Sequence, residues 1–261
     1  MTEITIFNNP ARRRLWQTPE QTPHPDLATL FEAKNQLIVL RHGDPPFAVV
    51  IGVPHQVPNG VWRICDERRD SNGRVKDRSG DDNVASLGLL VFSQLHRQNI
   101  PCKLVIMAHA TTHDPNKVLD SPYCQEVFQE KMHLLFECHA SSGRRRLDLE
   151  LSAGSNRVTR SLFWGQKLAA RLENRYRLGV QVKAGRRDAV VFLPNGSIVP
   201  DKLDLPAIKT ASLIEAGRRS IAGLYLETKP IFRVVDHMAN AVTPDGLILG
   251  RAIAATIISR S

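Results

Sequence analysis

The sequence predicts an α/β fold, a three-layer sandwich in which helices cover both faces of a mixed, largely parallel sheet. Apolar runs rich in β-branched residues alternate along the chain with segments whose apolar residues recur every three to four positions. Several runs are continuous, which is typical of strands buried on both faces. The 261 residues are the length of one large α/β unit, so a single domain over 1–261 is expected.

The first part of the chain contains two of these apolar runs. Residues 1–25 are polar and rich in proline, so we expect an irregular arm there, and 26–34 fit a short helix. Strands are expected at 37–40 (LIVL) and 47–53 (FAVVIGV), separated by the turn sequence RHGDPP. The charged, glycine-marked stretch 66–82 is expected to be a loop.

The middle of the chain continues the alternation. Residues 83–97 place their apolar side chains on one helix face, and Asp82 stands where a carboxylate commonly caps a helix. Strands are expected at 103–110 and 133–139, with a short helix at 125–132 between them.

The last part of the chain repeats the pattern with shorter elements. Its half-exposed strand alternates apolar with acidic residues. The expected elements are strands at 147–153, 180–184, 188–193 and 221–229, with helices at 162–178, 210–220 and 244–258.

The chain is basic, with 35 Lys and Arg against 26 Asp and Glu and a formal net charge of +9. This balance favours nucleic acid, anionic surfaces or small acidic substrates as partners. Nucleic acid is disfavoured because aromatic residues are only 6% of the chain and no recognition helix is evident. Most basic clusters are interpreted as solvated surface.

Two other features concern the surroundings of the protein. No stretch has the roughly 20 apolar residues of a membrane helix, and Arg12 to Arg14 interrupt the position of a secretory signal, so a cytoplasmic location is expected. The cysteines lack paired spacing, which favours reduced thiols over disulfides or a four-cysteine zinc site. They are Cys65, Cys102, Cys124 and Cys138. The oligomeric state stays open.

Two histidines follow apolar runs from distant parts of the chain. His55 comes after FAVVIGVP, and His139 ends LLFECH. Ligands gather beyond the carboxyl ends of strands in open α/β sheets, so the two side chains could meet there. A catalytic zinc ion needs three His or carboxylate ligands and an open position. Asp81 and Asp82 are available as the carboxylate, and Glu227, at the end of LYLE, is the candidate general base.

Each of these residues also has a structural interpretation. A histidine at a strand end is often only hydrogen-bonded, and Asp82 could serve as a helix cap. Glu227 could pair with Lys229 or an arginine. As a set at one edge of a sheet, however, they favour a metal-dependent hydrolase.

Several phrases of the sequence resemble the N-formylglutamate amidohydrolase family in their order. They are VPHQVPNG, GDDNVASL, VIMAHATTHDPNK, FECHAS and LYLE, and they span roughly residues 47–230. The departures are Gln56 in place of a glycine, Lys117 in place of an arginine, and Ala140 in place of a serine.

The resemblance implies a zinc-dependent hydrolase with a fold related to zinc carboxypeptidases, which cleaves the amide of an N-acylated acidic amino acid or a related small acidic substrate. Carried over residue by residue, it implies one zinc held by His55, Asp82 and His139, with Glu227 as base. Whether Asp81 or Asp82 is the carboxylate ligand stays open. The alternative is a relative that binds an anion without turnover.

An acidic substrate requires a cation in the pocket, and arginine matches a carboxylate with two parallel hydrogen bonds. Arg144, Arg145 and Arg146 follow His139 on the same expected loop, while Arg157 and Lys117 are rivals for the same role. Asn116 belongs to the DPNK phrase of the resemblance. The expected substrate-binding residues are therefore Arg144, Arg145, Asn116 and Arg157.

Overall fold

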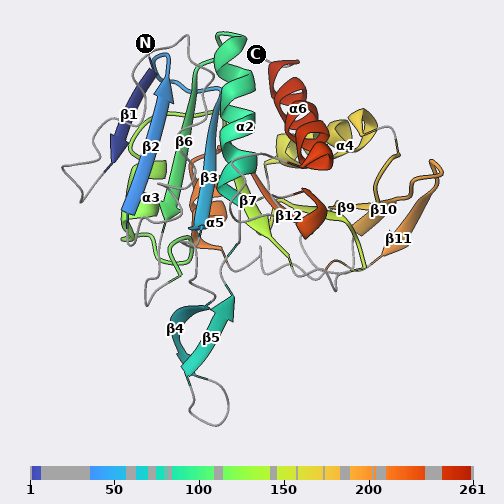
Figure 1. Cartoon of the computed structure of the whole chain (residues 1–261), viewed down its shortest axis with the longest axis horizontal. Helices are drawn as coiled ribbons and strands as arrows, with labels where there is room; N and C mark the ends of the chain where they lie inside the picture. The colour runs from blue at the N-terminus through green and yellow to red at the C-terminus, as the bar shows by residue number, and fades with distance from the viewer. Residues whose placement is uncertain are drawn as a thin grey trace.

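The structure, a computed structural model, describes most of the chain. The described residues are 2–6, 36–56, 63–69, 75–79, 81, 84–108, 114–141, 146–156, 158–172, 174–182, 189–201, 203, 210–232 and 243–259. Within them, ten strands form one mixed sheet (Figure 1). Across the sheet these are β1 (Thr2–Ile6), β2 (Gln36–His42), β6 (Cys102–Ala108), β3 (Val49–Gln56), β7 (Leu134–Ala140), β12 (Ala222–Thr228), β8 (Leu149–Ser152), β9 (Leu178–Gln181), β10 (Ala189–Phe192) and β11 (Ile198–Asp201).

The centre of the sheet is parallel and its flanks are mostly antiparallel. Strands β6, β3, β7 and β12 run in one direction. Strands β1, β2, β10 and β11 pair antiparallel with their neighbours, and so do β12 and β8. The carboxyl ends of β3, β7 and β12 therefore lie together at one edge.

Helices cover both faces, as the three-layer prediction requires. Helices α2 (Val84–Arg97), α4 (Thr159–Arg171) and α6 (Pro244–Ile258) pack on one face, and α3 (Pro122–Val127) and α5 (Ala211–Arg218) on the other (Figure 1). Alternate residues of each central strand enter the two layers: on β7, Phe136 and Cys138 join the α2, α4 and α6 core, and Leu135 joins the α3 and α5 core.

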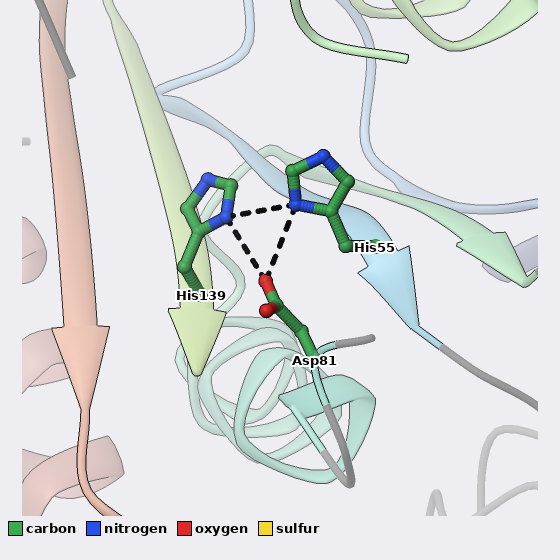
Figure 2. Close-up of side chains that lie close together, drawn as sticks. All are labelled: His55, Asp81 and His139. Carbon is green, nitrogen blue, oxygen red and sulfur yellow. Dashed lines mark hydrogen bonds and ion pairs between the residues drawn. The ribbon is translucent and has the colours of Figure 1, made fainter. Parts of the chain in front are cut away.

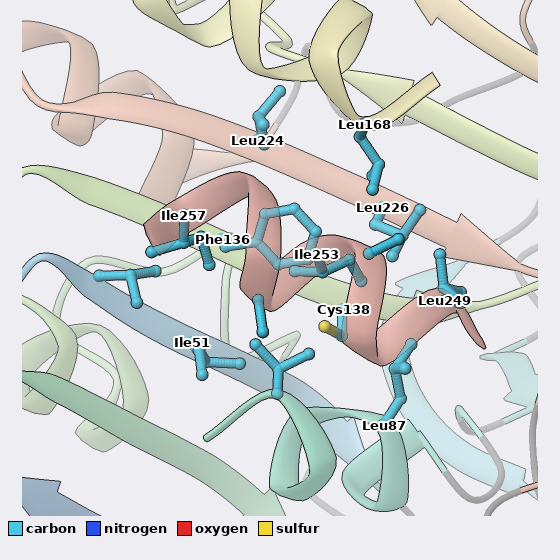
Figure 3. Packing of buried hydrophobic residues seen from close by; sticks show 14 of the residues in the cluster. Ile51, Leu87, Phe136, Cys138, Leu168, Leu224, Leu226, Leu249, Ile253 and Ile257 are labelled. Atoms are coloured by element: carbon cyan, nitrogen blue, oxygen red, sulfur yellow. The ribbon is translucent and has the colours of Figure 1, made fainter. Parts of the chain in front are cut away.

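Helix α6 illustrates how the larger core is built. Thr243 caps it by accepting a 2.9 Å hydrogen bond from the Gly246 amide. Leu249, Ile253 and Ile257 point from one side of the helix into the apolar layer over β7 and β12 (Figure 3). Gly250 permits close approach to α2, because a Cβ there would lie 2.4 Å from a methyl carbon of Leu90.

Long elements match their predicted positions. Helices 83–97 and 244–258 are confirmed, and the strands expected at 37–40, 47–53, 103–110, 133–139, 147–153, 180–184, 188–193 and 221–229 all have counterparts. The helix expected at 210–220 is α5. The helix expected at 26–34 lies outside the described residues.

Three predictions at the start and middle of the chain need correction. Thr2–Ile6 forms the edge strand β1 in the expected irregular arm, because TEITI alternates isoleucine with polar residues. The expected loop at 66–82 contains most of an antiparallel hairpin, β4 (Arg63–Arg69) with β5 (Val75–Ser79), which projects from the main sheet in Figure 1. Helix α3 starts earlier than the expected 125–132, since Ser121 caps it and Pro122 occupies its first turn.

Two further differences lie in the last part of the chain. The helix expected at 162–178 begins at Thr159 and ends at Arg171, and Leu178 already belongs to β9. Strand β11 and the short 3₁₀ helix η3 (Pro230–Phe232) were not predicted. Cys102, Cys124 and Cys138 are buried free thiols, as expected. No helix in the described part of the chain is long and apolar enough to span a bilayer.

A buried ion cluster joins β2 and β6 to α3 and the residues after it. Lys103 has no exposed surface, and its Nζ lies 2.6 Å from carboxylate oxygens of both Glu126 and Glu130. Arg41 approaches Glu126 to 2.6 Å. These charges lie near the amino end of β6, away from the strand ends that carry the histidines.

Replacing Lys103 by alanine is expected to lower the free energy of unfolding by about 3 kcal/mol, because the change removes a fully buried cation from Glu126 and Glu130 and leaves only the partly exposed Arg41 beside them. Urea denaturation monitored by circular dichroism measures this. Lys131→Ala, at an exposed position, serves as the control and should change stability little. Equal stability of the two variants would contradict the expectation.

Candidate metal centre

An irregularity in β3 brings His55 to the face where His139 lies. Val53 pairs with Ile106, but Gln56 pairs with Ala108, so β3 contains one residue more than β6 between these pairs. In a regular strand His55 would share the face of Val53, which belongs to the α2 layer. The extra residue reverses the alternation, and the His55 ring lies 5.0 Å from that of His139 on the opposite face.

His55, Asp81 and His139 converge at the strand ends (Figure 2). The Nδ1 atoms of the two histidines are 3.2 Å apart. Asp81 Oδ2 lies 3.3 Å from His55 Nδ1 and 3.0 Å from His139 Nδ1. All three residues are buried. The group could hold a metal ion.

The spacing of these three atoms fits a tetrahedral zinc ion. Ligands that bind zinc at about 2.0–2.1 Å lie about 3.3–3.4 Å from one another in a tetrahedron. The observed separations of 3.0–3.3 Å are close to that value. Two imidazoles and one carboxylate are also the ligand types of catalytic zinc sites with three protein ligands.

The backbone fixes the carboxylate of this group. The Asp81 amide donates to the carbonyl oxygen of His55 at 3.0 Å, and Asp81 forms a parallel bridge with Gln56. The Gln56 side chain accepts a 2.8 Å hydrogen bond from the Ala85 amide in the first turn of α2. Gln56 thus ties the start of α2 to the strand that carries His55.

The other ring nitrogen of each histidine meets polar groups. His55 Nε2 lies 2.7 Å from Asp114 Oδ1, and Asp114 also pairs with Lys117. His139 Nε2 lies 3.4 Å from Asn116 Nδ2 and 3.8 Å from a carboxylate oxygen of Glu137. A carboxylate or amide behind each histidine is typical of metal sites, where it fixes the ring and its tautomer.

The charges within the site shift the pKa values of its members. Burial lowers the pKa of His139, but its hydrogen bond to Asp81 and the nearby Glu137 carboxylate outweigh burial and raise it to about 9. The pKa of His55 is raised in the same way by Asp114 and Asp81. Burial raises the pKa of Asp81, yet the two histidines reverse this and hold it below its usual range. The site is therefore built from strongly paired charges.

Glu227 stands beside His139 on the neighbouring strand. The two residues pair in register between β12 and β7, and both are buried. Tyr225 links them: its ring stacks on the His139 ring at 3.9 Å, and its hydroxyl donates to Glu227 Oε1 at 2.9 Å. Lys229 pairs with Asp148, 3.0 Å away.

The structure brings together some of the residues proposed from the sequence. His55, His139 and Asn116 lie in one cluster, with Glu227 on the adjacent strand, and Asp81 is the carboxylate that faces both histidines. Arg146 is exposed, and its Nη1 lies 3.4 Å from Asp201 Oδ2. The remaining proposed residues, Asp82, Arg144, Arg145 and Arg157, lie outside the described residues.

Three contributors were missed from the sequence. Glu137 had a signal, because a carboxylate within the apolar run LLFECH and two positions before His139 lies on the same strand face. Tyr225 had a similar signal, because it lies two positions before Glu227 on the same strand face. Tyr123, whose hydroxyl donates to Glu137 Oε1 at 2.8 Å, had no such signal, since this contact depends on how α3 packs on the sheet.

No protein-family model and no curated protein matches the chain. Among solved structures, N-formylglutamate amidohydrolase from Ralstonia eutropha JMP134 is similar with a TM-score of 0.47 and 12% identity, over 86% of this chain and 96% of that one. A bacteriophage poly-gamma-glutamate hydrolase gives 0.46 and 14%, over 86% and 89%. A metallo-carboxypeptidase from Burkholderia cenocepacia gives 0.47 and 11%, over 86% and 60%. Values at this level assign no activity to this chain.

Proposed function

We propose that this protein is a zinc-dependent hydrolase that cleaves the amide bond of an N-acylated acidic amino acid or a related small acidic molecule. One observation carries the proposal: two histidine nitrogens and one carboxylate oxygen from three separate segments converge at the spacing of zinc ligands. The groups behind both rings support it, because they would hold each Nδ1 toward the ion.

The residues that would hold the ion are His55, Asp81 and His139. Asp82, the ligand first expected, is the other candidate for the carboxylate. A bound zinc ion would act as a Lewis acid toward the amide carbonyl. Burial of all three side chains strengthens their electrostatic interactions by excluding water.

Glu227 is proposed as the group that moves the proton. Its carboxylate would accept a proton from the attacking water and pass it to the nitrogen of the leaving amine. The Tyr225 hydroxyl, 2.9 Å from Glu227 Oε1, would keep the carboxylate oriented for both transfers. The pairing of Glu227 with His139 between β12 and β7 supports this role.

The acidic part of the substrate would be bound by arginine. Arg144 and Arg145 are proposed for this role because they closely follow β7, and Arg157 because it follows β8, the neighbour of β12; guanidinium groups match carboxylates. Asn116 is proposed to bind the amide. Its Oδ1 is buried and has no hydrogen-bond partner among the described residues, so it could accept the substrate N–H.

Zinc-loaded protein is expected to release free amino acid from the N-formyl and N-acetyl derivatives of glutamate and aspartate, because both the metal and the arginines would then have their partners. The same derivatives of leucine and lysine serve as controls and should react far more slowly. The measurement is the appearance of primary amine, before and after treatment with a chelator.

Chelation should abolish turnover, and zinc should restore it. Turnover that survives complete metal removal, or a preference for the lysine derivative, would contradict the proposal. Binding of the acidic derivatives without any turnover would favour the alternative of an anion-binding relative.

A further inference from the structure

A tyrosine and a carboxylate lie completely buried behind the candidate metal centre. Tyr123 of α3 donates from its hydroxyl to Glu137 Oε1 at 2.8 Å, and neither residue has exposed surface. Neither side chain can reach a substrate from that position. We propose that Tyr123 and Glu137 form a positioning pair that fixes His139 for metal binding, an inference that rests on the proposed metal-dependent function.

The pair reaches His139 through the second oxygen of Glu137. Glu137 and His139 are two residues apart on β7, so their side chains share a face. Glu137 Oε2 lies 3.8 Å from His139 Nε2. Asn116 Nδ2 donates to the same Oε2 at 3.3 Å. The carboxylate is thus held on one side by Tyr123 and on the other by Asn116, and it faces the outer nitrogen of the ring.

The chemistry of imidazole explains how an acceptor beside Nε2 would prepare His139 to bind a metal through Nδ1. A neutral histidine that binds a metal through Nδ1 carries its hydrogen on Nε2, and in a buried site that N–H needs an acceptor. Glu137 is an ionisable acceptor facing that nitrogen. An acceptor oxygen at this position favours the Nε2–H tautomer, and the fixed position of the carboxyl group limits rotation of the ring. Tyr123 would therefore act on the metal through two intermediaries, Glu137 and His139.

The contact between Tyr123 and Glu137 requires glycine at position 52, because a side chain there would collide with both residues. A Cβ at Gly52 would lie 2.0 Å from the Tyr123 hydroxyl oxygen and 3.2 Å from Glu137 Cγ. Any side chain at this position of β3 would therefore displace the hydroxyl from Glu137. Gly52 is also on the strand that carries His55, so a shift there would disturb both histidines.

The test is the zinc dissociation constant, measured by competition with a chromophoric chelator at fixed pH. Glu137→Gln is expected to weaken zinc binding 10- to 100-fold, and Tyr123→Phe about 10-fold. Tyr176→Phe is the matched control: it removes a hydroxyl that donates to Asp245, in the core on the other face of the sheet. That variant should bind zinc as the wild type does.

Two outcomes separate this inference from the proposed function. If the wild type binds zinc and Tyr123→Phe and Glu137→Gln bind it equally well, the positioning pair is wrong and the metal-dependent function stands. If the wild type binds no zinc, both the positioning pair and the proposed metal-dependent function are wrong.

A second measurement covers the case in which a variant folds poorly. Gly52→Ala should weaken zinc binding strongly in the wild type but much less in Tyr123→Phe, because the clashing hydroxyl is then absent. Thermal unfolding of the metal-free proteins should show the same rescue. Additive effects of the two substitutions on zinc affinity would overturn the inference.

Discussion

The purified protein is expected to bind about one zinc ion per chain, and both His55→Ala and His139→Ala are expected to retain almost none. Each substitution removes one of the three proposed protein ligands and leaves two, which are too few to hold the ion tightly. Elemental analysis of protein dialysed against trace zinc measures the content. His139→Ala should have the larger effect on the surroundings, since its ring also stacks on Tyr225.

His133→Ala is the matched control for both variants. His133 is an exposed histidine immediately before β7, and its backbone hydrogen bonds to Phe47 and Ala222 do not need the side chain. This variant should keep the wild-type zinc content. Full zinc content in folded His139→Ala would eliminate the metal centre, and the two histidines would return to structural roles.

Glu227→Gln is expected to reduce kcat 10²- to 10⁴-fold while zinc content is unchanged. The amide has nearly the same volume and can still accept the hydrogen bond from Tyr225, so the fold and the neighbouring His139 should be preserved. It cannot accept a proton at neutral pH. The measurement pairs steady-state kinetics on the best N-acyl substrate with elemental analysis of the same sample.

Glu215→Gln provides the control, because Glu215 lies on α5 and pairs with Arg219 at the surface. Its kcat should match that of the wild type. An unimpaired Glu227→Gln enzyme would remove Glu227 from the mechanism and leave the base unassigned. A loss of zinc along with activity would instead give Glu227 a role in holding the site together.

The sequence predicted elements whose own residues determine them. Helix α2 and helix α6 have long, regular apolar faces, and β7 is a continuous apolar run, so tertiary contacts only reinforce what is encoded locally. The hairpin of β4 and β5 is different. Its residues are mostly charged, and apolar patterning gives no signal for strands whose pairing is made by the backbone.

The sequence predicted those residues of the candidate site that follow the ends of apolar runs. His55 and His139 stand out because polar residues terminate apolar runs, and Asp81 was one of two adjacent candidates. Strict alternation along β3, however, would have placed His55 on the wrong face. The contact of Tyr123 with Glu137 depends on the docking of α3, which no local pattern in the sequence encodes.

The extra residue between Val53 and Gln56 has an evolutionary consequence. A deletion of one residue there would allow β3 to pair regularly with β6, which is compatible with an intact core. The same deletion would leave His55 opposite Met107, whose side chain lies in the α3 and α5 layer, but would shift His55 along β3 by about one residue, roughly 3.3 Å, relative to His139. A change in the spacing of the proposed metal ligands, with the pairing of the core strands retained, is thus a single genetic step away in this chain.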